Sequence, residues 1–230
     1  MPSLQTALIV GASRGLGLGL AREYLSHGWR VVATARDAKA AALRALQAEF
    51  EEALKIESVD IADGGQIAAL RQRLADRRFD LVFVNAGVTN DPDETIGEVA
   101  TEEFIRVMTT NALGPMRVVE AFTDQVRPDG VVAVMSSGLG SVADNDGGGW
   151  DVYRASKAAL NTLMKSFAAR RGDKRTYLAV APGWVRTDMG GASASLDVAT
   201  SCRGMADMIA ARRGQGGVAY VNYRNETVRW

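Results

Sequence analysis

The chain has 230 residues, of which 47% are hydrophobic, and its 27 Lys and Arg residues balance 27 Asp and Glu residues. This length suits one large domain or two small ones, and the zero net charge gives no electrostatic basis for binding nucleic acid or an anionic membrane. The single cysteine, Cys202, excludes an intrachain disulfide and suits a reducing cytoplasm. Residues 1–5 lack a signal-peptide pattern, and no apolar run approaches the ~20 residues that span a bilayer, so we expect a cytoplasmic protein.

Short apolar runs alternate with helical patterns along the whole chain. The predicted strands cover residues 6–10, 30–35, 55–59, 81–84, 131–135, 177–180 and 218–223. The predicted helices cover residues 18–26, 38–53, 67–74, 101–125, 153–167 and 197–211. Strands alternating with helices of this length indicate right-handed crossovers and a parallel sheet covered on both faces. The sequence therefore predicts one doubly wound α/β domain over residues 1–230, of the Rossmann type, with seven parallel strands.

A glycine-rich turn follows the first strand. Glycines at 11, 15 and 17 let the backbone turn sharply and approach a pyrophosphate, and the N-terminus of the next helix offers free N–H groups. In such a sheet, ligands bind beyond the carboxyl ends of the strands. The strict G-x-G-x-x-G fingerprint is absent, and a plain strand-to-helix turn is the alternative. The turn comprises Gly11, Ala12, Ser13, Arg14, Gly15, Leu16 and Gly17.

Tyr153 and Lys157 are the strongest candidates for chemistry. On a helix, residues four apart project side by side from one face. A free tyrosine, with a pKa of about 10, is a poor acid or base near neutrality. A fixed ammonium favours phenolate, and lowering the pKa by ~3 units needs roughly 4 kcal/mol. We therefore predict a tyrosine suited to proton transfer with an alcohol or carbonyl oxygen; the alternative is a solvated helix face.

Other polar or small residues occur at strand ends and inside one helix. Asn85-Ala86-Gly87 ends the fourth strand, where small residues let the backbone pass close to a cofactor. Asn111 interrupts an otherwise apolar helix, and a buried amide must find partners, so a bend or a bound water is expected. Ser136 and Ser137 end the fifth strand, and since side chains alternate, only one of them should face a substrate.

The order of these motifs resembles the short-chain dehydrogenase/reductase family over nearly the whole chain. Gly-x-x-x-Gly-x-Gly follows the first strand, Asn-Ala-Gly the fourth, and Tyr-x-x-x-Lys comes later. The resemblance implies that Tyr153 exchanges a proton with the substrate, Lys157 lowers its pKa, Ser137 orients the substrate oxygen and Asn111 positions a water connected to Lys157. Ser136 is expected to bond to backbone instead.

The resemblance also implies a cofactor site. Asp60-Ile61 would flank the adenine, although an acidic strand end or helix cap is an equal alternative. The family commonly has a doubled asparagine where this chain has Val84 and Asn85. The backbone at Val185 would meet the nicotinamide carboxamide, and Thr187 would complete the site. The implied cofactor residues are Gly11, Ser13, Arg14, Gly15, Leu16, Gly17, Arg36, Asp60, Ile61, Asn85, Ala86, Gly87, Tyr153, Lys157, Pro182, Gly183, Val185 and Thr187.

The second strand bears on the choice between NADP and NAD. An acid at its end would bond the ribose hydroxyls of NAD and repel the extra phosphate of NADP. In NAD-using relatives that acid sits at the place of Ala35. Arg36 and Arg14 supply guanidinium groups, which suit phosphate. We therefore expect NADP(H) to be favoured over NAD(H), unless Asp37 takes the place of the acid.

A longer loop between Ser137 and Tyr153, a short C-terminus and Trp230 look most like the C-factor and sniffer-like carbonyl reductase branch. The implied reaction is NADPH-dependent reduction of an aldehyde or ketone; the alternative is an NADP(H)-binding signalling or redox-sensor protein with little or no turnover. Trp150 lines the pocket or anchors packing, and residues 189–195 form a lid or a connector. We expect no metal, and a homodimer or homotetramer through the helices around 101–125 and 153–170.

Overall fold

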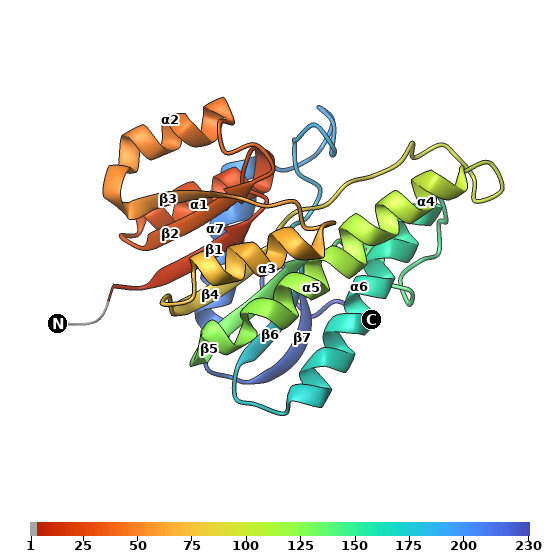
Figure 1. Cartoon of the computed structure of the whole chain (residues 1–230). Helices are drawn as coiled ribbons and strands as arrows, with labels where there is room; N and C mark the ends of the chain where they lie inside the picture. The colour runs from red at the N-terminus through yellow and green to blue at the C-terminus, as the bar shows by residue number, and fades with distance from the viewer. Residues whose placement is uncertain (1–3) are drawn as a thin grey trace.

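A sheet of seven parallel strands forms the centre of the computed structural model, which describes residues 4–230 (Figure 1). Part of the N-terminal segment used to exclude a signal peptide, residues 1–3, lies outside the described residues. The strands are β1 (Thr6–Val10), β2 (Arg30–Ala35), β3 (Leu54–Ser58), β4 (Phe79–Val84), β5 (Val126–Met135), β6 (Thr176–Ala181) and β7 (Gly217–Asn222). The predicted doubly wound α/β fold is thereby confirmed.

Helices connect the strands and cover both faces of the sheet (Figure 1). The α-helices are α1 (Gly15–Ser26), α2 (Ala41–Phe50), α3 (Gly64–Arg73), α4 (Thr101–Met108), α5 (Gly114–Phe122), α6 (Asp151–Arg171) and α7 (Val198–Arg212). A π-helical turn, η2 (Thr109–Leu113), joins α4 to α5. The 3-10 turns are η1 (Glu51–Ala53), η3 (Thr123–Gln125) and η4 (Gly138–Gly140).

The strand order is β3-β2-β1-β4-β5-β6-β7. The chain therefore winds outward from β1 to β3 and then returns to place β4 on the other side of β1. In register, Val10 at the end of β1 pairs with Val84 at the end of β4. Because the loops after these two strands diverge to opposite faces, a crevice for a ligand is expected at their carboxyl ends.

Alternate residues of the central strands face two separate cores. Leu8 and Val10 pack in the core under α3, α5 and α6, whereas Ala7 and Ile9 pack in the core under α1, α2 and α7. All four side chains are fully buried. Burial on both faces explains why these strands read as continuous apolar runs.

One predicted helix is broken in the structure, and the other five have different bounds. The run predicted over 101–125 consists of α4, the π turn η2 and α5. The first helix begins at Gly15, so two of the loop glycines lie in its first turn. The helix predicted over 38–53 shortens to α2 followed by a 3-10 turn. The bend expected at Asn111 takes the form of this π turn, in which Asn111 is buried.

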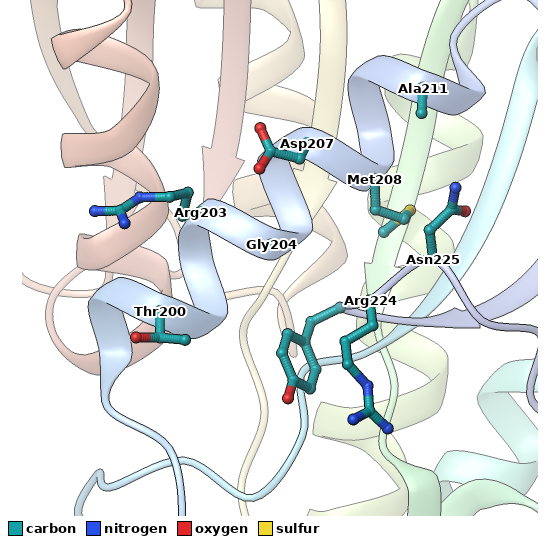
Figure 2. Close-up of a pocket in the computed structure, with 9 residues that line it drawn as sticks. Thr200, Arg203, Gly204, Asp207, Met208, Ala211, Arg224 and Asn225 are labelled. Carbon is teal, nitrogen blue, oxygen red and sulfur yellow. The ribbon is translucent and has the colours of Figure 1, made fainter.

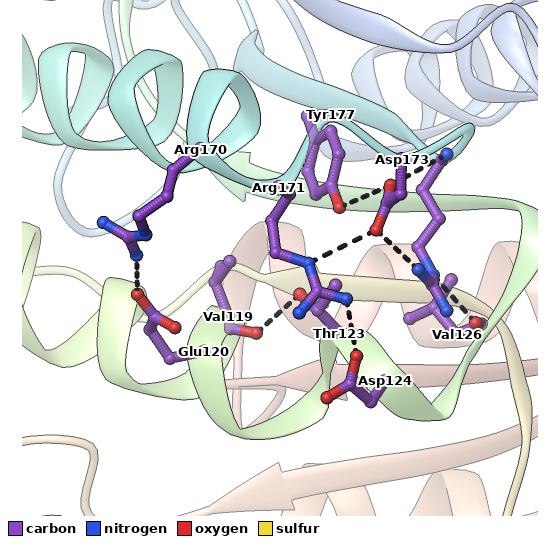
Figure 3. A network of polar contacts seen from close by, with 10 residues as sticks. Val119, Glu120, Thr123, Asp124, Val126, Arg170, Arg171, Asp173 and Tyr177 are labelled. Carbon is purple, nitrogen blue, oxygen red and sulfur yellow. Dashed lines mark hydrogen bonds and ion pairs between the residues drawn. The ribbon is translucent and has the colours of Figure 1, made fainter.

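A polar network ties the end of α6 to the end of α5 (Figure 3). Arg170 pairs with Glu120, and Arg171 contacts Asp124 at 2.6 Å. These contacts lie at the end of α6 opposite Tyr153, about 30 Å away along a helix of this length. The place of α6 over the sheet is set mainly by its buried side chains, among them Leu160 and Met164, which pack in the core.

Candidate active site

Tyr153 and Lys157 lie on successive turns at the start of α6, as their spacing predicted. Trp150, in a left-handed conformation (φ 57°), precedes the helix and turns the chain sharply into it. Both side chains are buried, with Tyr153 8% and Lys157 2% exposed. The Lys157 Nζ atom lies 5.6 Å from the centre of the Tyr153 ring and donates a hydrogen bond to the Met135 carbonyl at 2.8 Å.

Burial controls the ionisation of this pair. It raises the pKa of Tyr153 to about 12, although a hydrogen bond with Ser137 acts in the lowering direction. Burial also lowers the pKa of Lys157 to about 8. The net direction is opposite to the lowering expected from Lys157, because burial of the hydroxyl disfavours the phenolate. The tyrosine hydroxyl is protonated at neutral pH.

Asn111 sits in the π turn and uses its amide on the protein itself. Its Oδ1 accepts a hydrogen bond from the Val88 N–H at 2.8 Å, and its Nδ2 donates to the Val88 carbonyl and to Ser156 Oγ at 2.8 and 2.9 Å. A Cβ atom on Gly87 would lie 3.3 Å from both Asn111 Oδ1 and Lys157 Nζ. The three residues thus converge at the end of β4, where a side chain at position 87 would make a tight contact.

The two serines after β5 point to different partners. Ser137 accepts a hydrogen bond from the Leu139 N–H at 3.2 Å and faces the Tyr153 hydroxyl. Ser136 is buried and donates to Asn161 Oδ1 at 2.6 Å. Ser137 is therefore the serine on the side of Tyr153, as the family resemblance implied. The expected backbone partner of Ser136 is wrong, because the Asn161 amide occupies that place.

The glycine turn is too crowded for side chains. Gly11 has φ +87°, and a Cβ atom there would lie 2.7 Å from Ala86. A Cβ atom on Gly17 would lie 2.1 Å from the Gly11 carbonyl oxygen. Asn85 Nδ2 donates to that same oxygen at 2.7 Å, so the asparagine holds the turn against the end of β4. No side chain caps the start of α1, whose N–H groups are available to a phosphate.

Two guanidinium groups lie near the end of β2 and the glycine turn. Arg14 is 76% exposed and pairs with Asp188, which is 75% exposed. Arg36 is exposed just beyond the end of β2, and Ala35 is buried. Asp37 accepts a hydrogen bond from the Lys39 N–H at 2.8 Å, so its carboxylate is engaged in its own turn. The strand therefore ends without an acid, in a basic setting that fits a ribose phosphate.

Asp60 and Ile61 lie just after β3. Asp60 Oδ1 accepts a hydrogen bond from the Ala62 N–H at 2.9 Å, which closes a local turn. The N-cap of α3 is Asp63, not Asp60, which excludes the alternative that Asp60 caps the helix. Ile61 is buried, and a Cβ atom on Gly114 would lie 2.8 Å from its carbonyl oxygen. Both residues therefore lie just beyond the carboxyl end of β3.

Residues 182–196 form a loop after β6 that is held by its own contacts. Gly183 has φ +84°, and Val185 is buried and bridges to Leu196. Thr187 accepts a hydrogen bond from the Gly190 N–H at 3.1 Å. A Cβ atom on Gly15 would lie 3.5 Å from the Thr187 methyl group, so this loop reaches the glycine turn. Pro182 accepts a hydrogen bond from Ser201 Oγ at 2.7 Å.

Two aromatic residues complete the surroundings of Tyr153. The Trp150 ring packs edge-on against the Tyr153 ring, with 5.8 Å between centres. Tyr220, on β7, donates a hydrogen bond to the carbonyl oxygen of Ser137. The sequence reasoning did not identify Tyr220, and its position near the carboxyl end of the last strand was the one available signal.

Two hollows on the surface are lined by other residues than Asn111, Ser137, Tyr153 and Lys157. A groove of about 490 Å³ runs between α7 and residues 223–225 (Figure 2). A second hollow, of about 630 Å³, is lined by residues that include His27, Trp29 and Arg213.

Within residues 4–230, no helix is both long and apolar enough to cross a membrane. Over the same range, no three His, Cys, Asp or Glu side chains gather as a metal site would require.

Comparison with known proteins gives consistent matches over most of the chain. The C-signal protein of Myxococcus xanthus is 36% identical over 154 residues, which is 66% of this chain and 92% of that protein. A short-chain dehydrogenase/reductase structure from Burkholderia multivorans with bound NADP has a TM-score of 0.96 and 50% identity, covering 99% of this chain and 100% of the other. A carbonyl reductase from Pseudomonas aeruginosa PAO1 in complex with NADP has a TM-score of 0.92 and 36% identity, with the same coverage.

The fold and the order of its motifs define a Rossmann-type oxidoreductase. The model of the short chain dehydrogenase family matches residues 5–196, and the chain belongs to that family. The predicted resemblance to the C-factor and sniffer-like carbonyl reductase branch is confirmed by these relatives.

Proposed function

We propose that this protein is an NADPH-dependent reductase that converts an aldehyde or ketone to an alcohol. The observation that carries the proposal is the buried Tyr153, which lies beside Lys157 and Ser137 at the carboxyl edge of the sheet. A phenol that stays protonated is a proton donor, and reduction of a carbonyl needs a donor at its oxygen. The family membership and the carbonyl reductase among the relatives support the same reaction.

In the proposed mechanism, the Ser137 and Tyr153 hydroxyls hold the carbonyl oxygen of the substrate. A nicotinamide cofactor, once bound at the carboxyl edge of the sheet, would supply the hydride for the carbonyl carbon. As negative charge grows on the oxygen, Tyr153 donates its proton, which leaves an alcohol and a tyrosinate. The Lys157 ammonium, 5.6 Å from the ring centre, stabilises that tyrosinate, which is the charge that burial otherwise disfavours. The two hydrogen bonds between the Asn111 amide and the Val88 backbone hold the segment that follows β4.

The proposed cofactor preference rests on the charges beyond β2. Arg14 and Arg36 would hold the ribose phosphate of NADP, with Arg14 leaving its exposed pair with Asp188. An exposed pair is worth little, so this exchange costs little. The Asp37 carboxylate accepts a hydrogen bond from the Lys39 backbone N–H within its own turn, which supports this preference. Two relatives with 50% and 36% identity hold NADP.

The proposal is tested by following NADPH oxidation with a panel of aldehydes, ketones and quinones. We expect turnover of at least one carbonyl compound, and slower turnover with NADH at the same concentration. Absence of turnover across the panel, in a protein that NADPH stabilises against heat, would refute the reductase assignment.

A second candidate, an NADP(H)-binding signalling or redox-sensor protein, is favoured by the similarity to the C-signal protein. The same panel separates the two candidates, since a sensor binds NADPH tightly and reduces none of the compounds. A pure binding protein needs the glycine turn but has no use for a buried phenol beside an ammonium. For this reason we place the reductase first.

We also propose that the chain forms a homodimer or homotetramer in the cytoplasm through α4, α5 and α6. These helices and the π turn η2 between α4 and α5 expose large apolar side chains, including Ile105, Leu113 and Leu163 at 55%, 43% and 42%. Sedimentation equilibrium tests the assembly, with Leu163→Asp expected to weaken it. A wild-type protein that sediments as a monomer at micromolar concentration would contradict it.

A further inference from the structure

Tyr220 is a fully buried residue of β7 that reaches the turn after β5. Its hydroxyl donates a hydrogen bond to the Ser137 carbonyl oxygen and also interacts with the side chains of Ser136 and Asn161. Burial raises the pKa of Tyr220, so the hydroxyl keeps its proton and remains a donor. The general family resemblance gave no role to this position.

The Ser137 carbonyl belongs to the turn that directs the Ser137 side chain. The same oxygen accepts a hydrogen bond from the Gly140 N–H at 2.9 Å, and Ser137 Oγ accepts one from the Leu139 N–H at 3.2 Å. A Cβ atom on Gly140 would lie 2.9 Å from Lys157 Cβ, so the turn also packs tightly on α6. Any movement of the Ser137 carbonyl therefore moves the hydroxyl that faces Tyr153.

Residues 227–230 run back along β7 and cover Tyr220. Thr227 bridges to Val221 in the antiparallel direction, and the Val228 N–H donates to the Tyr220 carbonyl at 2.8 Å. The Trp230 ring lies 5.5 Å from the Tyr220 ring, centre to centre. The Lys165 ammonium lies 4.9 Å from the centre of the Trp230 ring, which ties the segment to α6.

The same segment holds the loop that follows Ser137. The Ala143 N–H donates to the Trp230 carbonyl at 3.3 Å. Arg229 Nε donates to Asp144 Oδ1 at 2.6 Å, and Asp144 Oδ2 accepts from Ser141 Oγ at 3.0 Å. Residues 227–230 thus contact Tyr220 on one side and the loop 141–144 on the other.

We propose that Tyr220 is a positioning residue for Ser137, and that residues 227–230 hold Tyr220 and the loop 141–144 in register with it. A hydroxyl that orients a substrate oxygen must be held to within about 0.5 Å, and this requires locked neighbours. Tyr220 fixes the turn through its hydrogen bond to the Ser137 carbonyl oxygen, which leaves the Ser137 hydroxyl free to face the substrate. The structural part of this inference is independent of the proposed reduction, and its kinetic part rests on it.

Hydrogen exchange tests the structural part on the full-length protein. Tyr220→Phe keeps the ring against Trp230 and removes the hydroxyl. We expect amides in residues 138–144 to exchange at least about fivefold faster, the loss expected for one hydrogen bond. The matched control is Tyr177→Phe, because Tyr177 is equally buried and its hydroxyl bonds Asp173 far from the site (Figure 3). Unchanged exchange in Tyr220→Phe would overturn the inference whether or not the protein reduces carbonyls.

A double-mutant cycle tests the kinetic part with whichever carbonyl compound the wild type reduces fastest. Tyr220→Phe should lower kcat about fivefold and leave KM for NADPH unchanged, since it acts through one hydrogen bond. In a Ser137→Ala background, the same change should have no further effect on kcat. An equal loss in both backgrounds would show that Tyr220 acts elsewhere and overturn the inference. A wild type that reduces no carbonyl refutes the proposed function instead, and the exchange result still decides the positioning role.

Discussion

The ammonium of Lys157 lies 5.6 Å from the centre of the Tyr153 ring, and both groups are buried. Burial favours the neutral form of each group, and it lowers the pKa of the lysine to about 8 and raises the pKa of the tyrosine to about 12. At neutral pH the lysine is charged and the phenol is neutral. This is the pair of states that carbonyl reduction requires, since the phenol gives its proton and the ammonium stabilises the anion left behind.

Replacing Lys157 by Met should change how stability depends on pH. The folded-state pKa of about 8 lies below the usual 10.5, so between these values the unfolded chain binds more protons and wild-type stability gains with rising pH. Relative to Lys157→Met, the wild type should gain up to about 3 kcal/mol from pH 7.5 to 10.5. Urea unfolding of both proteins at each pH isolates the contribution of Lys157, because all other groups are common. A constant difference would show that the lysine pKa is not lowered by burial.

Replacing Arg14 or Arg36 by Ala should weaken NADPH binding selectively. Each guanidinium is proposed to meet the ribose phosphate, and loss of one charge-assisted hydrogen bond costs about 1.5–3 kcal/mol, or about 10-fold to 100-fold in Kd. NADH binding should change by less than about twofold. The control is Arg22→Ala, whose exposed side chain pairs with Glu49 on the surface. Equal losses for NADPH and NADH, measured by calorimetry, would exclude phosphate recognition by these residues.

Replacing Gly17 by Ala should destabilise the fold and abolish cofactor binding. A Cβ atom there would lie 2.1 Å from the Gly11 carbonyl oxygen and 2.6 Å from Asn85 Nδ2, so the whole turn must shift. Overpacking of this kind costs about 1–3 kcal/mol. Gly64→Ala is the control, since a Cβ atom at Gly64 meets nothing within 4 Å. If both variants have the melting temperature of the wild type and bind NADPH equally well, the close packing of the turn has no functional consequence.

The sequence pattern predicted the bounds of an element where neighbouring residues alone determine where it ends. The predicted bounds of β1 and β2 match, because buried apolar runs end at Gly11 and at the polar pair after Ala35. A bend at Asn111 was predicted but its form as a π turn was not, since the amide finds its partners at Val88 and Ser156, which only the folded chain brings near.

The sequence predicted that Tyr153 and Lys157 lie together, but it did not predict the direction in which the Tyr153 pKa shifts. The family motifs identify Tyr153 and Lys157, and the helical spacing places them together. The direction of the tyrosine pKa shift depends on how many atoms cover it, which a sequence pattern does not contain. Tyr220 escaped prediction for a related reason, because it meets Ser137 across 83 positions in the chain.

The central claim is that Tyr153 delivers the proton in carbonyl reduction, and Tyr153→Phe tests it most directly. Kd for NADPH and kcat should be measured in wild type, Tyr153→Phe and the control Tyr177→Phe, with the best carbonyl compound from the panel. We predict that Tyr153→Phe binds NADPH within about twofold of wild type and loses at least about 100-fold in kcat, the usual contribution of a general acid, while Tyr177→Phe keeps both values. A folded Tyr153→Phe protein that reduces the compound at the wild-type rate would contradict the mechanism.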